Sequence, residues 1–509
     1  MARPRIKLIT LPWELEVPTL SLASLAAVTP PHFDVAIVDL LRQRLHFDEP
    51  TDLVGITAST PRIKAAYALA DLYRARGVKV VLGGHHASAM PDEALAHADA
   101  VVVGEGETAW QRLCEEFLVS PSRVTGIHRD PAPNLSTLPQ PRVDLMHLER
   151  YGAWYYPLIA SRGCPEACSF CFAKRMTLGY RTYPIAHVLE QVRRRPAWVK
   201  GAYFVDDNLT ADPDYARELF RALARFGVVF GMQSRHEFSR EGEDLALARK
   251  AGCILISSGY ESINQESLDG TGKRSMAELH RDTAAAQFRE GIIPSGNWMF
   301  GFDWDGPDIF ARTLEFLDDT DLLHCSFTTE IPFPGTQAWK AYRLEGRLLT
   351  EDYDDFVGKD HVVVRPARMT PDELREGVRW LATHYYSAGR CARRGLKAAR
   401  NPRLAPLGQF TRLPALFGLQ AFQLWQWHYR MVPSLQWLYR RILSVNKHRY
   451  FGDLLRSTDF WASEHAPAGG PSDEELSLAG PFIATQGLKP SPKRRLAPSQ
   501  AQPRNPARA

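Results

Sequence analysis

The stretch Ser161–Phe172, with the sequence SRGCPEACSFCF, decides how this chain of 509 residues is interpreted, because it holds three cysteines in the order C-x-x-x-C-x-x-C. Iron–sulfur clusters are bound by cysteine thiolates. Cys164, Cys168 and Cys171 on one short loop can therefore bind three irons of a [4Fe-4S] cube, which leaves the fourth iron without a protein ligand. An open coordination position on a metal is what binding of a substrate or cosubstrate requires. The spacing thus predicts a reactive iron–sulfur site.

Two other uses of these cysteines fit less well. A structural zinc site takes four ligands, and no fourth cysteine or histidine lies nearby in the sequence. A disulfide would leave one thiol over. Seven cysteines in 509 residues are too few for a disulfide scaffold, and the chain opens on no secretory signal.

The cysteine spacing, with the aromatic Phe170 directly before the third cysteine, resembles the radical S-adenosylmethionine superfamily. There the open iron chelates the amino and carboxyl groups of S-adenosylmethionine, and one electron from the cluster cleaves the sulfonium to a 5′-deoxyadenosyl radical. The resemblance implies a [4Fe-4S] cluster and S-adenosylmethionine as cofactors. It also implies an external electron donor such as flavodoxin or ferredoxin.

Residues 1–140 alternate short apolar runs with helical patterns. Strands are expected at 6–11, 33–38, 53–57, 79–82 and 100–103. This alternation predicts a doubly wound parallel sheet of the Rossmann or flavodoxin type, which binds ligands at the carboxyl ends of its strands. The loops at those ends contain Thr57, Ser59, Thr60, Gly83, Gly84, His85, Gly104, Glu105 and Gly106.

The segments Val80–Ala87 and Val103–Glu107 resemble the cobalamin-binding domain found ahead of many radical S-adenosylmethionine domains. The resemblance implies that the nine loop residues bind cobalamin, with His85 and His86 beside the corrin and not on cobalt. One feature departs from the better-known cobalamin fold, because the chain has no Asp-x-His-x-x-Gly loop to supply a cobalt ligand. We therefore expect cobalamin without a lower histidine ligand, or a domain that has kept the fold and lost the cofactor.

Residues 150–345 show about six further strand–helix units, fewer than the eight of a full barrel. This number matches the (β/α)6 partial TIM barrel that the superfamily resemblance implies. Several polar residues follow the strands, where a simple helix N-cap is the alternative role. The resemblance places Phe170 beside adenine, Asp207 and Asn208 at the methionyl amino group, Gln233 and Arg235 at the ribose or carboxylate, and Glu261 at the ribose hydroxyls. No catalytic residue is assigned.

Residues 346–460 are expected to form a helical domain, with Thr370 as the N-cap of one helix. The segment Leu416–Leu443 is aromatic and basic, which fits either packing against a neighbouring domain or peripheral contact with a membrane. Residues 466–509 have the composition of a disordered tail.

The overall composition favours a cytoplasmic enzyme. A net charge of +4 is too small to indicate a nucleic-acid partner. The sequence lacks an uninterrupted apolar run of the roughly 18 residues that a membrane span needs.

The two resemblances together imply a class B radical S-adenosylmethionine methyltransferase, which methylates an unactivated carbon of a small, and by hypothesis hydrophobic, molecule. One alternative is cyclisation, carbon–carbon coupling or rearrangement of a lipid or tetrapyrrole without methyl transfer. Another is a non-catalytic electron-transfer protein, although a simple ferredoxin cluster takes four cysteines.

Overall fold

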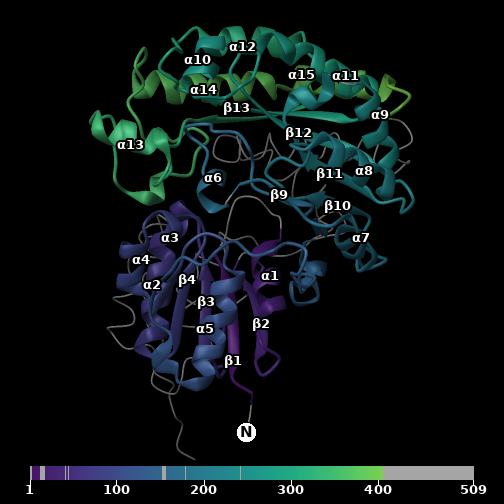
Figure 1. The fold of residues 1–509 in the computed structure, drawn as a ribbon. Coiled ribbons are helices and arrows are strands. Elements are labelled where there is room, and N and C mark those ends of the chain that lie inside the picture. The colour runs from purple at the N-terminus through teal and green to yellow at the C-terminus, as the bar shows by residue number, and fades with distance from the viewer. Residues whose placement is uncertain are drawn as a thin grey trace, which may run out of the picture. The chain divides into compact units, whose positions relative to one another are not determined.

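A computed structural model describes residues 3–11, 18–40, 42–43, 45–151, 156–177, 179–240 and 242–404. These residues fall within one compact unit, 1–447 (Figure 1). The expected segment Leu416–Leu443 and the expected tail 466–509 lie outside the described residues. In the ranges described, no helix is both long and apolar enough to cross a bilayer.

The N-terminal part is built on a six-stranded parallel sheet with the order β2-β1-β3-β4-β5-β6. Its strands are near-continuous apolar runs, as expected for a sheet covered on both faces. They span β1 Arg5–Thr10, β2 Asp34–Asp39, β3 Leu53–Thr57, β4 Lys79–Gly83, β5 Ala100–Val102 and β6 Gly126–His128. Five of these were expected from the sequence, whereas β6 has only three residues and shows no pattern.

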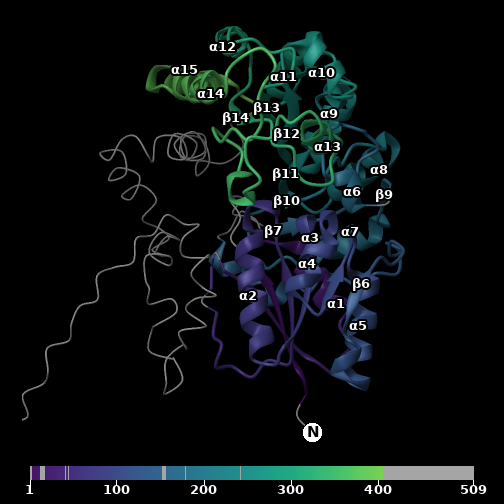
Figure 2. The ribbon, with the colours of Figure 1, turned by 90° about the vertical axis from the view of Figure 1, so that its left-hand side faces the viewer.

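Helices cover both faces of this sheet, so it is doubly wound (Figure 2). Helix α1 packs with α5, and α2 packs with α4. The helices are α1 Leu20–Val28, α2 Ile63–Ala75, α3 His85–Ala89, α4 Pro91–His97 and α5 Glu107–Val119. The short helix α3 was not expected from the sequence.

The second sheet also has six parallel strands, in the order β7-β10-β11-β12-β13-β14. Its edge strands β7 and β14 do not pair with each other in the described chain, so the barrel is open, as expected. The strands are β7 Tyr156–Leu158, β10 Gly201–Phe204, β11 Val229–Gln233, β12 Cys253–Glu261, β13 Ile293–Phe300 and β14 His324–Thr329.

Helices follow these strands on one side of the sheet. They are α7 Ile185–Arg193, α8 Pro213–Leu223, α9 Gly242–Ala251, α10 Gln265–Gly270, α11 His280–Arg289 and α12 Ile309–Asp318. Along β14, the residues that face the helices are buried while the alternate residues remain half-buried. The face of β14 that points away from the helices is therefore the less buried one.

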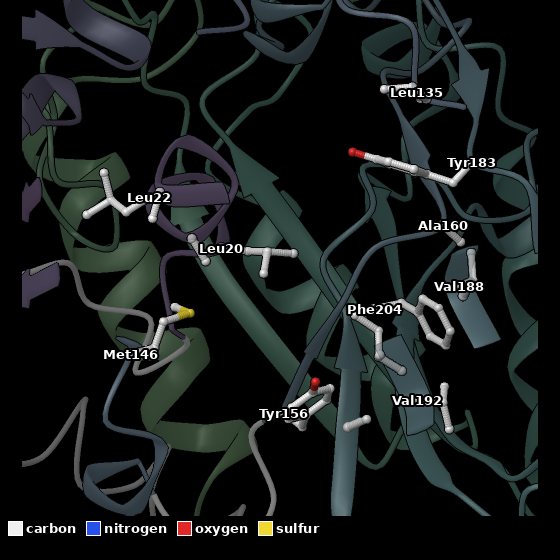
Figure 3. Close-up of a cluster of buried hydrophobic side chains, with 14 of the residues drawn as sticks. Leu20, Leu22, Leu135, Met146, Tyr156, Ala160, Tyr183, Val188, Val192 and Phe204 are labelled. Atoms are coloured by element: carbon white, nitrogen blue, oxygen red, sulfur yellow. The ribbon is translucent and has the colours of Figure 1, made fainter. Parts of the chain in front are cut away.

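The hydrophobic core extends from α1 to the second sheet (Figure 3). Leu20 and Leu22 of α1 belong to the same buried cluster as Phe204 of β10. This shared core stabilises the contacts between the two sheets by removing apolar surface from water.

Up to residue 404, where the described part of the chain ends, the second sheet is followed by the helices α13 Gln337–Leu344, α14 Pro371–Tyr385 and α15 Ala388–Arg400. Thr370 caps α14 as expected, in a capping box with Glu373. The buried Tyr386 donates to the carbonyl oxygen of Cys325 at 2.5 Å, which ties this region to β14. The proposed helical domain 346–460 continues beyond the described residues.

Candidate active site

The three motif cysteines lie on a loop between β8 (Ser161–Arg162) and the short helix α6 (Ala173–Met176). The two-stranded ribbon of β8 with β9 (Arg181–Thr182) flanks this loop. The Ser169 amide donates to the Thr271 carbonyl at 2.8 Å, and the Ser169 carbonyl accepts from the Ala338 amide at 3.0 Å. The loop is therefore held by the second sheet's own connections.

The cysteine loop fits a cubane cluster. All three thiols are free and at least partly accessible, whereas Cys114, Cys253, Cys325 and Cys391 are buried. No three His, Cys, Asp or Glu side chains converge on a single ion within the part of the chain described. A cubane does not need such convergence, because each cysteine binds a different iron.

Desolvation perturbs the ionisation of two groups at the cysteine loop. The Cys171 side chain is exposed, yet desolvation raises its pKa to about 12. Asp207, three residues after the end of β10, is also exposed, and desolvation raises its pKa as well. The surrounding protein therefore disfavours the charged form of both groups. Bound iron would favour the thiolates, since a coordinating thiol is deprotonated.

Three of the predicted contacts to S-adenosylmethionine lie on or against the cysteine loop. Asp207 accepts a hydrogen bond from the Gly163 amide, and Asn208 interacts with the Cys164 thiol. The half-buried Phe170 ring lies 6.3 Å from the ring of Phe302. These residues remain predictions for cofactor binding, but all of them lie on or against the cysteine loop.

Two of the predicted charged contacts already have partners in the protein. Arg235 forms an ion pair with Glu166 of the cysteine loop at 2.7 Å and another with Glu237 at 2.7 Å. Glu261, which has a φ of 61°, pairs with Lys273 at 2.7 Å, and both side chains are nearly buried. Neither Glu166 nor Lys273 stands at the end of a strand, so the sequence alone gives no signal for these two partners.

A ladder of polar side chains crosses the inner face of the second sheet. The Tyr203 hydroxyl of β10 interacts with Gln233 of β11 and Ser257 of β12. Asn297 of β13 donates to the Ser257 hydroxyl at 3.1 Å. Gln233 was selected from the sequence, whereas the other three lie within strands, where local pattern does not distinguish an inner face from an outer one.

The predicted cobalamin loops lie at the carboxyl ends of β3, β4 and β5. Gly84 has a φ of 92°, and an added Cβ would lie 2.5 Å from the Thr57 hydroxyl oxygen. His86, expected beside the corrin, is instead fully buried, with its ring nitrogens 3.2 Å from Thr60 Oγ1 and 3.3 Å from Glu93 Oε1. Thr60 is thus engaged inside the domain, and Thr57 and Ser59 are the more accessible hydroxyls of this loop.

His85, in the predicted cobalamin loop after β4, lies beside the cysteine loop. Its side chain is exposed, and desolvation lowers its pKa, which favours the neutral imidazole. Its ring lies 5.2 Å from that of Phe172, the residue after Cys171. Gly83, Gly104 and Gly106 are half-buried at the same edge, where absent side chains leave room for a large ligand. The arrangement fits a corrin beside the cysteine loop.

Comparisons with known proteins agree with this geometry. Residues 6–113 match the B12 binding domain family, and residues 158–316 match the radical SAM superfamily. The first match covers the N-terminal sheet through β5, and the second covers the cysteine loop and the strands up to α12.

Named relatives extend over most of the chain. The chain is 28% identical over 393 residues to bacteriochlorophyllide d C-12(1)-methyltransferase of Chlorobaculum tepidum, covering 74% of this chain and 84% of the relative. It is 26% identical over 332 residues to anaerobic magnesium-protoporphyrin IX monomethyl ester cyclase of Rubrivivax gelatinosus, covering 58% and 59%.

The structure of the cobalamin-dependent S-adenosylmethionine radical enzyme OxsB has the same fold, with a TM-score of 0.62 at 14% identity, over 96% of this chain and 82% of that one. With both domain matches in this order, the chain belongs to the radical S-adenosylmethionine enzymes that carry an N-terminal B12-binding domain.

Proposed function

We propose that this enzyme methylates an unactivated carbon of a small molecule, with a [4Fe-4S] cluster on Cys164, Cys168 and Cys171. When bound, the cluster with S-adenosylmethionine supplies the radical, and cobalamin supplies the methyl group. The observation that carries the proposal is the approach of His85 to Phe172, with ring centroids 5.2 Å apart. It brings the predicted corrin loop next to the cysteine loop, so that one substrate bound beside them would reach both.

The roles of the protein's own side chains follow from their placement. Asp207 and Asn208 would orient the amino group of S-adenosylmethionine beside the open iron, because a cationic ammonium prefers a carboxylate partner. Gln233 and Glu261 would bind the ribose. Arg235 would hold the loop through Glu166, and not bind a free carboxylate, because its charge is already shared with two acidic groups.

A ring-bearing, largely apolar substrate is the class that the relatives favour, since the named methyltransferase acts on bacteriochlorophyllide d. Phe170, Phe172 and Phe302 supply aromatic surface near the cysteine loop. The polar ladder from Tyr203 to Asn297 would hydrogen-bond neutral polar groups of such a substrate. We place the enzyme in the cytoplasm, with a flavodoxin- or ferredoxin-type electron donor.

Ring closure without methyl transfer is the second candidate, because a cyclase is among the relatives. The coproducts separate the two reactions. Methyl transfer releases S-adenosylhomocysteine as well as 5′-deoxyadenosine and methionine, whereas pure radical chemistry releases only the last two. The electron-transfer alternative is not supported, because the relatives are enzymes.

The decisive experiment is anaerobic reconstitution of the full chain with iron, sulfide and hydroxocobalamin. We expect bound iron, visible absorbance from both cofactors, and reductive cleavage of S-adenosylmethionine. Cys168→Ala should lose iron and cleavage. Cys114→Ala is the matched control, because Cys114 is buried in the other domain's core and should cost only stability. Unchanged iron content in Cys168→Ala would refute the proposed site.

A further inference from the structure

A network of buried ion pairs joins the loop after β5 to the strand that leads into the cysteines. Arg162 Nη1 lies 2.7 Å from Glu105 Oε2, and Arg162 Nη2 lies 2.5 Å from Glu107 Oε1. Arg181, opposite Arg162 in the β8–β9 ribbon, also forms an ion pair with Glu105. We call these four residues the clamp. Its two arginines and two glutamates balance in charge.

The clamp is shielded from water. The side chains of Arg162, Glu105 and Glu107 are 11%, 7% and 6% exposed, respectively, whereas that of Arg181 is 26% exposed and lies at the edge of the network. Most ion pairs in the described chain lie at the surface, where salt and side-chain entropy make them weak. In a buried pair, loss of one partner leaves an uncompensated charge in a poorly hydrated site, so the remaining groups must move or admit water.

Both ends of the clamp adjoin the predicted cofactor loops. Glu105 and Glu107 flank Gly106, and the Gly104 amide donates to the Ser88 hydroxyl of α3 at 2.9 Å. Arg162 stands two positions before Cys164, separated by Gly163. A change in the conformation of either loop would therefore alter the distances on which the ion pairs depend.

We propose that the clamp couples cobalamin binding to assembly of the cluster loop, so that each cofactor raises the affinity of the protein for the other. The inference rests on the proposed function, because it takes Gly104–Gly106 as part of the cobalamin site. Binding of cobalamin fixes Glu105 and Glu107, which fix Arg162 and thereby the start of the cysteine loop. Thermodynamic linkage requires the reverse effect to be equally large.

The alternative is that the clamp only stabilises the fold. In that case a substitution in the clamp would lower the stability of the protein and its affinity for each cofactor. It would not change how strongly one cofactor affects the affinity for the other. Coupling is therefore measured as a ratio, which a uniform loss of stability leaves unchanged.

The experiment titrates the full chain with hydroxocobalamin under anaerobic conditions, once after chelator treatment and once with the cluster reconstituted. Spectral changes of the corrin report the dissociation constant in each form. We expect wild-type protein with the cluster to bind cobalamin at least about fivefold more tightly, the lower end of typical coupling. Glu107→Gln keeps the shape of the side chain and removes its charge, and should bring the ratio close to one.

Two further variants keep the test interpretable. Glu116→Gln makes the same change on the same helix, in an exposed pair with Arg112 at 3.5 Å, and should keep the wild-type ratio. If Glu107→Gln does not fold, Arg162→Lys keeps the charge but loses the two-pronged geometry, and should lower the ratio in part. As a reciprocal readout, cobalamin should slow the loss of iron to a chelator in wild-type protein.

Equal cobalamin affinity in the two wild-type forms would overturn the coupling while leaving the proposed function intact. A wild-type ratio in Glu107→Gln or Arg162→Lys would show that coupling does not pass through the clamp. Failure of wild-type protein to bind cobalamin at all would overturn both the proposed function and this inference.

Discussion

Substituting Gly163 by alanine should disable the cysteine loop by a close approach that only glycine permits. Gly163 has a φ of 82°, and an added Cβ would lie 2.4 Å from the carbonyl oxygen of Gly179 and 2.7 Å from Thr177 Oγ1. A left-handed conformation costs an alanine about 1–2 kcal/mol. The overlap with a backbone atom cannot be relieved by a rotamer change, and such overpacking adds about 1–3 kcal/mol. We therefore expect Gly163→Ala to lower the free energy of unfolding by about 2–5 kcal/mol in total.

Gly179 provides a matched control in the same region. Its φ is 81°, so alanine there pays the same backbone cost, but nothing lies within 4 Å of the added Cβ. Gly179→Ala should therefore lower the free energy of unfolding by only about 1–2 kcal/mol. The difference between the two variants isolates the effect of the close approach.

The assay measures iron and sulfide per chain after anaerobic reconstitution, together with the urea midpoint of unfolding. Gly163→Ala should hold substantially less iron, because the shift displaces the adjacent Cys164 and the hydrogen bond from the Gly163 amide to Asp207. Gly179→Ala should hold the wild-type amount. If both variants lose the same stability and bind the same iron, the packing of Gly163 does not control the cluster loop.

Two further predictions concern the cobalamin loops and the end of β14. Gly84→Ala should weaken hydroxocobalamin binding about tenfold in a spectral titration, or ~1.4 kcal/mol, because its Cβ would overlap Thr57 Oγ1 at 2.5 Å. Gly77→Ala is the control and should leave hydroxocobalamin binding unchanged, because Gly77 has a φ of 76° and open space around the added Cβ. Equal losses of affinity in the two variants would contradict this reasoning. Burial raises the pKa of Glu330 from 4.5 to about 7, so the folded state favours the protonated acid, and stability should fall as pH rises through this window. The loss of folding free energy is on the order of 3 kcal/mol. It is measured by comparing urea midpoints of unfolding at pH 5 and pH 8, and Glu330→Gln should remove this difference. If the variant keeps the pH dependence of the wild-type protein, another group is responsible.

Local signals in the sequence were sufficient for the main elements of the fold. Strand–helix alternation predicted both parallel sheets, because a strand buried on both faces and an amphipathic helix differ in hydrophobic period. The elements that were missed, such as β6 with three residues and α3 with five, are too short for a period to show. The predicted domain boundaries and cofactor contacts remain predictions.

The sequence by itself placed Cys164, Cys168 and Cys171 together, because three residues on one loop are close in space whatever the rest of the chain does, and their spacing predicts a cluster there. Only the tertiary structure decided which charges meet. Arg162 reaches Glu105 across 57 residues, and Arg235 reaches Glu166 across the mouth of the barrel. Such pairs depend on which strand ends become neighbours when the sheets form. Local spacing along the chain contains no record of which charges will meet.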